Sequence, residues 1–345
     1  MGFDLSVLLV FLATVIAIMV LPYDKSLIAL FGAIAMVLIS KQYSFEDAFN
    51  AIEWDVIFVL IGTWIITGYM SKSGLPNHIV VYLSKRFRSP AVLMLLIVLL
   101  SGFLSMFLTN VLIVLLFGEL AISIASMYGL DPLVAAMAVG LAANYMGTAL
   151  MVGDFPPLLL HKVAGAEFLD FIVFKGVPSS MPLLTASFLA TVSVFYFWWF
   201  RGLRGEALRL DESRFNQVRL DKVTAIISVL GLTMFIVLAT LRPILGVSLG
   251  ALAISSAVFT ALVLEVLRHK LRKDDDIPPF EAVVKDLDWS VVLFYAALFV
   301  LVGGLEAGGV LRSFAEAVTS FIGEDIISSY TAIFWLTALL SAVVE

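Results

Sequence analysis

The chain is 345 residues long, 61% apolar and 14% charged, with a formal net charge of −6 and a mean hydropathy of +1.07. This composition excludes an ordinary soluble domain, and the apolar residues lie in runs bounded by charge clusters, as in multi-pass membrane proteins. The absence of cysteine excludes disulfides, thiolate metal sites and thiol catalysis.

Eight apolar runs predict membrane-spanning helices. In chain order they cover residues 5–21, 26–40, 56–70, 132–151, 182–200, 223–241, 248–266 and 290–305. The first run is interpreted as a retained span and not as a signal peptide, because no basic segment precedes it and no small-residue cleavage site follows it. We therefore expect an all-α polytopic protein of the cytoplasmic membrane, embedded in the lipid bilayer and without a nucleic-acid partner.

A further apolar segment, residues 91–125, is interrupted near its middle by Thr109 and Asn110. If this segment enters the membrane and returns to the same side as a re-entrant hairpin, 16 of the 21 Lys and Arg residues lie on one side. A single crossing would instead place the basic loops on opposite sides. Because Lys and Arg concentrate in cytoplasmic loops, the hairpin is the favoured topology and the basic side is cytoplasmic.

The sequence pattern that leads into the span after Trp54 returns at Trp289. With the hairpin topology these two spans cross in opposite directions, so the chain is expected to contain an inverted repeat, which is typical of secondary transporters. Residues 1–200 form the first repeat, with the hairpin at 91–125 and a broken helix at 132–165. Residues 201–222 form a cytoplasmic linker, and residues 223–345 form the second repeat.

The second copy stops at the position that matches Thr109, so it is expected to be incomplete. A shortened protein, half of a split transporter and a piece of a longer chain all fit this pattern. Because an alternating-access site needs groups from both repeats, the chain alone is expected to transport poorly, and a partner that supplies the missing segments is expected to restore transport.

The densest polar group in an apolar surrounding covers residues 144–157. Two glycines, a Thr, an Asp and a Pro pair do not continue a regular helix, and unwound backbone at membrane depth lines a cavity or is buried in protein. Its carbonyl groups, with the Asn144 amide, the Thr148 hydroxyl and the Asp154 carboxylate, are suited to replace the hydration shell of a cation. A surface turn uses the same residue types, so the pattern alone leaves both interpretations open.

Two motifs resemble signatures of the arsenite/sodium–proton antiporter permeases, the P protein-like family of the ion transporter superfamily. They are Asn144-x-x-Gly147-Thr148-Ala149-x-x-x-Gly153-Asp154-x-Pro156-Pro157 and Phe107-Leu108-Thr109-Asn110-Val111. The resemblance implies two re-entrant hairpins and two broken helices that face one site at mid-membrane. The N-termini of the half-helices there would favour an anion, and unwound carbonyl groups would favour a cation.

The chain departs from that family where the family has an Asp and this sequence has Thr109. The lost carboxylate removes a group that could bind a proton or a cation, which disfavours sodium–proton exchange. The pair Thr109-Asn110 is more similar to the Ser-Asn-Thr tips of the related divalent-anion/sodium symporters. An extra Phe155 also separates Asp154 from the two prolines.

The leading functional prediction is a secondary active transporter for a small inorganic ion or anion, of the arsenite efflux or cation/proton antiport type. A sodium-coupled di- or tricarboxylate transporter is the alternative, and a non-transporting remnant or half of a split transporter is the alternative of another class. An enzyme is not expected, because hydrolase motifs are absent from the sequence. No cofactor is expected beyond a coupling Na⁺ or H⁺, and a homodimer is expected from the family. The candidate site residues are Thr109, Asn110, Asn144, Gly147, Thr148, Gly153 and Asp154.

Overall fold

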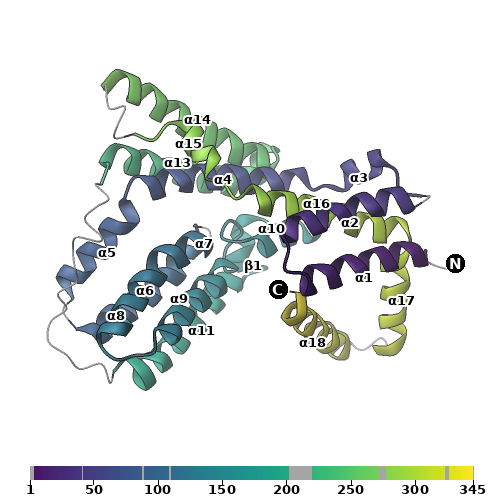
Figure 1. The fold of residues 1–345 in the computed structure, drawn as a ribbon, viewed down its shortest axis with the longest axis horizontal. Coiled ribbons are helices and arrows are strands. Elements are labelled where there is room, and N and C mark those ends of the chain that lie inside the picture. Colours follow the sequence, from purple (N-terminus) through teal and green to yellow (C-terminus); the bar gives the residue numbers. More distant parts are fainter. Residues whose placement is uncertain are drawn as a thin grey trace. The chain divides into compact units, whose positions relative to one another are not determined.

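The computed structural model describes residues 4–40, 42–87, 89–108, 110–201, 220–271, 277–322 and 326–344. These residues are mostly helical (Figure 1). Among them, five helices are long and apolar enough to cross a membrane, namely Trp54–Lys72, Ser180–Phe200, Lys222–Leu245, Leu249–Lys270 and Trp289–Ala307. The predicted all-α polytopic fold class is confirmed.

The elements follow one another in this order. They are α1 (Leu5–Val20), α2 (Lys25–Ile39), α3 (Phe45–Ala51), α4 (Trp54–Lys72), α5 (Leu75–Arg86), α6 (Pro90–Ser105), α7 (Asn110–Ile113), the π-helix η1 (Val114–Gly118), α8 (Glu119–Met127), α9 (Pro132–Gly147), α10 (Phe155–Ala164), the 3₁₀-helix η2 (Phe168–Phe171), the antiparallel strands β1 (Val173–Phe174) and β2 (Val177–Pro178), α11 (Ser180–Phe195), the π-helix η3 (Tyr196–Phe200), α13 (Lys222–Leu245), α14 (Leu249–Leu271), α15 (Phe280–Lys285), α16 (Trp289–Ala307), α17 (Val310–Ile322) and α18 (Ile326–Val344).

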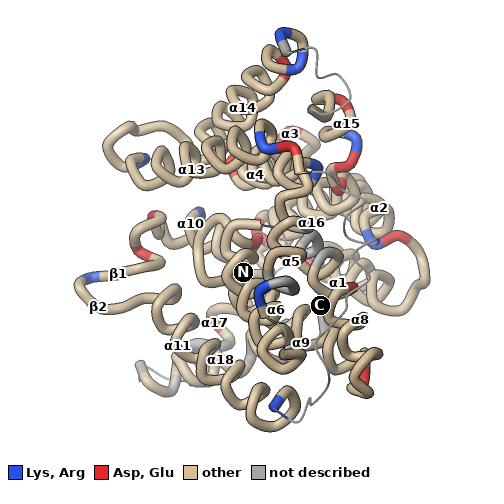
Figure 2. The backbone as a smooth tube through the Cα atoms, turned by 90° about the vertical axis from the view of Figure 1, so that its left-hand side faces the viewer, with Lys and Arg blue, Asp and Glu red and all other residues tan. Residues whose placement is uncertain are grey.

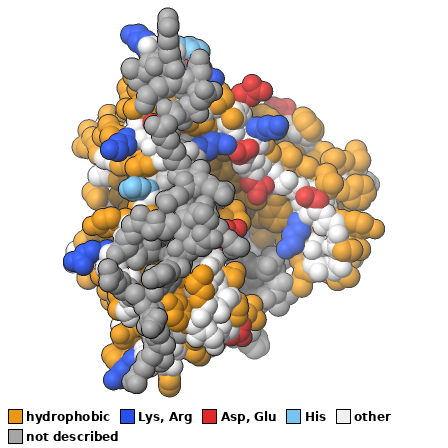
Figure 3. Space-filling view, turned by 60° about the vertical axis from the view of Figure 1, so that its left-hand side comes forward, with side chains coloured by type: hydrophobic (Ala, Val, Ile, Leu, Met, Phe, Trp, Pro, Cys, Tyr) orange, Lys and Arg blue, Asp and Glu red, His pale blue; other side chains and the backbone are white. Residues whose placement is uncertain are grey.

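Many of the long helices expose large apolar side chains. Along α13 and α14 the charged residues lie near the helix ends (Figure 2), and hydrophobic side chains cover much of the surface that is visible in Figure 3. Several large apolar side chains are strongly exposed, among them Phe31, Leu38, Trp198 and Ile244. Exposed apolar area of this extent suits contact with lipid chains, because water would not solvate it favourably.

The chain divides into two compact units. The first contains residues 1–57 and 288–345, and in it α16 packs against α1, α2 and α3. Small residues allow this close packing: a Cβ atom on Gly304 would lie 2.5 Å from Cγ of Met36. The buried hydroxyl of Tyr43, in the loop between α2 and α3, donates a hydrogen bond to the Val300 carbonyl oxygen at 2.9 Å.

The second unit contains residues 58–287 and holds two groups of helices. In one group α13 packs against α14, and α4 approaches α14 so closely that a Cβ atom on Gly62 would lie 2.6 Å from the backbone of Ala253. In the other group α6, α8 and α11 pack against α9. The side chains of Ile97, Leu120 and Met146 are fully buried in this second group, which carries the predicted site.

The order of elements repeats at a constant spacing. The helices α4 and α16 begin at Trp54 and Trp289, 235 residues apart (289 − 54), and α3 and α15 begin at residues 45 and 280, the same distance apart (280 − 45). The helices α5 and α17 begin at residues 75 and 310, again 235 residues apart (310 − 75). The block made of α3, α4 and α5 therefore recurs as α15, α16 and α17. The inversion of the two copies across a membrane stays a prediction.

The short helix of each copy packs against the long helix of the other copy. In the first unit α16 packs against α3, and a Cβ atom on Gly303 would lie 2.5 Å from Cβ of Ala51. In the second unit a Cβ atom on Gly68 of α4 would lie 2.9 Å from the Val283 side chain of α15. Gly68 and Gly303 occupy equivalent positions, 235 residues apart (303 − 68). Each long helix therefore uses the same glycine to receive the short helix of the other copy.

Candidate functional site

The segment predicted as a hairpin consists of two helical limbs. The helix α6 ends at Ser105, residues 106–108 form a turn, and the chain returns through α7, η1 and α8. Both η1 and α8 contact α6, and Figure 1 shows α8 beside the beginning of α6 and α7 near its end. Entry of this hairpin into the membrane from the cytoplasmic side stays a prediction.

The predicted broken helix consists of α9 and α10, separated by the non-helical residues 148–154. Two details differ from the expectation. The helix predicted over 132–151 already ends at Gly147, and the proline pair lies in the first turn of α10 and not in the unwound stretch. The reason is that the first turn of a helix has no partner for its backbone N–H groups, so proline loses nothing there.

Asn110, the first residue of the return limb, connects the hairpin to the broken helix. Its side-chain amide Nδ2 donates a hydrogen bond to Oδ2 of Asp154 at 2.8 Å, and it lies 3.5 Å from Oδ1 of Asn144. The Ser105 hydroxyl, at the end of the first limb, donates to Oδ1 of Asn110. One side chain therefore joins both limbs of the hairpin to both halves of the broken helix.

Asp154 has a second bond, which anchors it to α10. It is the N-cap of that helix, and its Oδ1 accepts a hydrogen bond from the backbone N–H of Phe155 at 2.8 Å. Its two carboxylate oxygens thus face different partners, one in α10 and one in the hairpin. The side chain is neither fully exposed nor fully buried.

Gly147 and Gly153 allow the hairpin tip to approach the helix break. A Cβ atom on Gly147 would lie 2.6 Å from Oδ1 of Asn110. A Cβ atom on Gly153 would lie 2.3 Å from the Gly147 carbonyl oxygen, 2.8 Å from that of Ser105 and 2.9 Å from that of Met106. Only glycine fits at such approaches, and three backbone carbonyl oxygens consequently lie close to Gly153.

The remaining predicted site residues have different positions. The Thr148 hydroxyl donates to the backbone carbonyl oxygen of Tyr145 at 2.9 Å, so this bond serves the end of α9 and not the contact with Asn110. Asn144 is exposed and reaches the network through the long contact with Asn110. Thr109 lies outside the described residues. The structure thus brings together Asn110, Asn144, Gly147, Gly153 and Asp154.

Ser105 is a site residue that the sequence reasoning did not select. It is fully buried, and its hydroxyl fixes the orientation of the Asn110 amide. A signal was present in the sequence, because a hydroxyl residue ends the apolar limb just before the polar tip, and Ser341 stands one residue beyond the place that the spacing of 235 gives in the second copy (105 + 235 = 340). Serine in an apolar helix is usually satisfied by its own backbone, which makes such a signal weak.

A second polar contact lies beyond the other end of α10. Arg242, in the last turn of α13, forms an ion pair with Glu167, the residue that precedes η2. Their side chains are 26% and 27% exposed, and the backbone N–H of Glu167 also donates to Asp170 at 2.8 Å. The pair ties α13 to the loop that follows α10. Among the described residues, groups of three or more His, Asp or Glu that could hold a metal ion are absent.

The chain matches a transporter family over nearly its whole length. A family model described as citrate transporter matches residues 8–345. An uncharacterized transporter of Mycobacterium tuberculosis is 27% identical over 343 residues, which cover 97% of this chain and 76% of that protein.

More distant relatives include two proteins with other names. The magnetosome protein MamN of Magnetospirillum gryphiswaldense is 26% identical over 349 residues, which cover 96% of this chain and 74% of that protein. The human P protein is 21% identical over 401 residues, which cover 93% of this chain and 46% of that protein. The predicted relation to P protein-like transporters is thereby confirmed. The chain belongs to the citrate transporter (CitMHS) family of the ion transporter superfamily.

Proposed function

We propose that this protein is a secondary active transporter of the cytoplasmic membrane that couples a cation, Na⁺ or H⁺, to the movement of a small anion. The observation that carries the proposal is the bond between Asn110 of the hairpin and Asp154 of the broken helix. Interrupted helices that meet through polar groups form the binding sites of secondary transporters, because their freed backbone groups replace the hydration shell of an ion.

Di- and tricarboxylates of the citrate type are the first substrate class to test, because the matching family model carries that description. The second candidate is arsenite efflux or cation/proton antiport. It is favoured by the resemblance of residues 144–157 to the antiporter signature and by the carboxylate of Asp154 within the site. Three expectations stay predictions: that the protein forms a homodimer, that a partner supplies the segments missing from the second repeat, and that the two repeats are inverted.

Each site residue has its own role in the proposed transport. Asp154 supplies a negative charge for the cation, and the carbonyl oxygens beside Gly153 supply neutral ligands. Asn110 and Ser105 connect this charge to the hairpin tip. Binding of a cation would strengthen the contact between tip and break, because both contribute oxygen atoms. Ion occupancy is thereby linked to hairpin position, which is the link that coupled transport requires.

The test is uptake by cells that lack their own citrate and arsenite transporters and express the native gene product containing these 345 residues. Radiolabelled citrate and arsenite are offered with imposed Na⁺ or proton gradients. The variants are Asp154→Asn and, as a matched control, Asp131→Asn, which alters the N-cap of α9. We expect gradient-driven flux that falls at least tenfold in Asp154→Asn and persists in Asp131→Asn. Equal flux in both variants, or flux of neither substrate under any gradient, would refute the proposal.

A further inference from the structure

The ion pair between Arg242 and Glu167 uses part of what each side chain offers. It joins one guanidinium nitrogen, Nη1, to one carboxylate oxygen, Oε1. Among the described residues, Nε of Arg242 and Oε2 of Glu167 have no hydrogen-bond partner, although both atoms are buried. A guanidinium group binds a well-placed carboxylate through two parallel hydrogen bonds. Arg242 therefore keeps donors for a carboxylate that fits it better than Glu167 does.

Arg242 needs a negatively charged partner, and a solute can take that part. A partly buried guanidinium group without a counter-charge is costly, whereas the exchange of one anion for another leaves the charge compensated. The side chains of Arg242 and Glu167 are 26% and 27% exposed, so solutes reach the pair. An anion that makes two bonds to the guanidinium group gains the second bond that Glu167 does not supply. It can therefore compete with Glu167 for Arg242.

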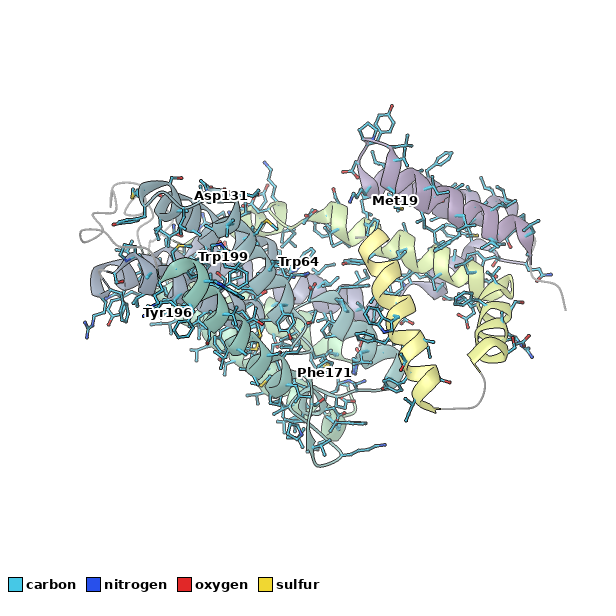
Figure 4. All side chains as sticks on the ribbon, turned by 90° about the horizontal axis from the view of Figure 1, so that it is seen from below. Met19, Trp64, Asp131, Phe171, Tyr196 and Trp199 are labelled. Atoms are coloured by element: carbon cyan, nitrogen blue, oxygen red, sulfur yellow. The ribbon has the colours of Figure 1, made fainter. Side chains whose placement is uncertain are left out.

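The pair joins α13 to the chain segment that follows the broken helix. Arg242 is in the last turn of α13, and Glu167 precedes η2, which contacts α13. Phe171, the last residue of η2, lies beside the start of α11, at the opposite end of that helix from Trp199 (Figure 4). Because α10 has ten residues, it is about 15 Å long, and Glu167 follows its far end from Asp154. The pair is thus separate from the contact between hairpin tip and helix break.

The charges around the pair favour an anion. Lys162 in the last turn of α10 and Lys175 in the turn between β1 and β2 are both exposed. With Arg242 they give three positive charges, against the two negative charges of Glu167 and Asp170. The Asp170 carboxylate already accepts a hydrogen bond from the backbone N–H of Glu167 at 2.8 Å. An excess of positive charge raises the local concentration of anions.

We propose that Arg242 is a binding site for a small carboxylate anion, and that Glu167 takes the place of this anion when none is bound. The anion displaces Glu167, forms two parallel bonds with the guanidinium group and releases α13 from the loop that follows α10. A carboxylate is the matching class because a carboxylate already pairs with Arg242 there. The inference rests on the proposed function, in which the protein carries a small anion, and it assigns that anion a contact far from Asp154 along α10.

The test replaces the internal carboxylate by one from solution. Glu167→Ala removes the carboxylate and opens its volume. The purified full chain, in nanodiscs of phosphatidylcholine, which has no net charge, is heated in choline chloride, choline acetate or choline citrate at equal ionic strength and pH. We expect Glu167→Ala to unfold at a lower temperature than the wild type in chloride. Acetate and citrate should recover at least half of this loss, with saturation, because Arg242 regains a partner.

Two controls separate this recovery from a general effect of salts. In Glu316→Ala the partner of Arg312 is removed from an ion pair whose side chains are 84% and 68% exposed, so carboxylates should not shift its unfolding midpoint. In Glu167→Ala with Arg242→Gln the guanidinium group is absent, and the recovery should disappear. A response of the same size in either control overturns the proposal, and so does the absence of recovery in Glu167→Ala.

Binding of radiolabelled citrate to the same nanodiscs tests the displacement of Glu167. Glu167→Ala should bind citrate at least fivefold more tightly than the wild type, because the internal competitor is gone. Arg242→Lys keeps the positive charge and the pair with Glu167, but an ammonium group lacks the two parallel donors, so it should bind at least fivefold more weakly. Equal affinities of the wild type and Glu167→Ala would show that the anion does not replace Glu167, and the proposal would be wrong.

Anion binding and transport can fail separately. If the flux assay fails while acetate restores the stability of Glu167→Ala, the proposed function is wrong and the anion site at Arg242 stands. If flux is driven by a gradient while Glu167→Ala does not respond to carboxylates, the assignment of Arg242 is wrong and the transporter remains.

Discussion

The Asn110 side-chain amide donates a 2.8 Å hydrogen bond to Asp154 Oδ2, across 44 residues of sequence. This bond connects a hairpin tip to a helix break, two kinds of irregular backbone that a membrane tolerates only where protein or a cavity surrounds them. The bond pairs one donor of the Asn110 amide with one oxygen of the Asp154 carboxylate.

Replacement of Asn110 by Asp tests this contact through charge. A second carboxylate would stand at hydrogen-bond distance from Asp154, so we expect a loss of about 1–3 kcal/mol in the free energy of unfolding, the usual cost of an unsatisfied buried polar group. The double variant Asn110→Asp with Asp154→Asn restores an amide–carboxylate pair and should recover most of the loss. Chemical denaturation in detergent measures both values, and simple additivity of the two changes would argue against the contact.

Replacement of Gly147 by Ala tests the close approach of the hairpin tip. The new Cβ atom would lie 2.6 Å from Oδ1 of Asn110 and would displace that side chain, at a typical overpacking cost of about 1–3 kcal/mol. Gly140→Ala, in the same helix, is the control, because a Cβ atom there meets no atom within 4 Å. The control should be neutral or more stable by up to about 1 kcal/mol, as expected for Gly→Ala in a helix. Equal effects of the two variants would contradict the close approach.

The membrane topology of the hairpin is tested by labelling. Cysteines introduced at Ser89, just before α6, and at Tyr128, just after α8, should react with a membrane-impermeant reagent from the same side. The native chain contains no cysteine, so the background is clean. Reaction from opposite sides would show that the segment crosses the membrane, and the inverted repeat would then be wrong.

The ion pair between Arg242 and Glu167 is tested by removing one of its charges and by exchanging the two residues. Glu167→Gln leaves a largely buried guanidinium group without its counter-charge, and we expect a loss of about 1–3 kcal/mol, below the full cost of a buried pair because both side chains are about a quarter exposed. Exchange of the two residues, Glu167→Arg with Arg242→Glu, should restore part of it. Thermal unfolding midpoints in nanodiscs provide the comparison. Failure of the exchanged pair to recover any stability would indicate that the surrounding loop, and not the charge, is decisive.

Tyr43 predicts a loss of stability in alkali. Burial, together with the negative charges of Asp47 and Glu306, raises the pKa of its phenol to about 12 from the ordinary value of 10.0. Its stabilising contribution is therefore fully present below pH 10 and is lost as the pH rises towards 12, because the folded protein disfavours the phenolate. Tyr43→Phe removes the hydrogen bond to Val300 and should cost about 1 kcal/mol at neutral pH. Tyr23→Phe, at an exposed position, should cost nothing measurable.

Much of this molecule could be predicted because apolar runs and helix breakers are local signals. The runs at residues 5–21 and 26–40 correspond to α1 and α2 within one residue at each end, and the interruption at Asn110 marks the hairpin tip. The end of α9 was predicted four residues too late, because apolar residues continue through Leu150 and Met151 after the helix has stopped. Hydropathy reports burial in these residues and not their backbone conformation.

The contacts of the site were less predictable than its members. Asn110 and Asp154 were both candidates, but their mutual bond depends on how far the hairpin tip reaches, which the spacing of residues does not encode. Ser105 was missed because its role appears only when the Asn110 amide is in place. The Thr148 hydroxyl bonds within its own helix end, and its part in ion binding stays a prediction.

The exchange of short helices between the two copies has a consequence for how the protein is made. The glycine face of α4 at Gly68 is covered by Val283, and these residues are 215 positions apart (283 − 68). At a synthesis rate of about 5–20 residues per second, roughly 10–40 seconds pass between the synthesis of α4 and the synthesis of α15, the helix that covers Gly68. The interval between the synthesis of α3 and the synthesis of α16, which packs against it, is longer still. Nascent chains that stall within this interval should therefore be cleaved more readily by proteases, and should pair their helices wrongly more often, than chains released after α16. The membrane insertion machinery then has to protect these chains until the second copy has been synthesised.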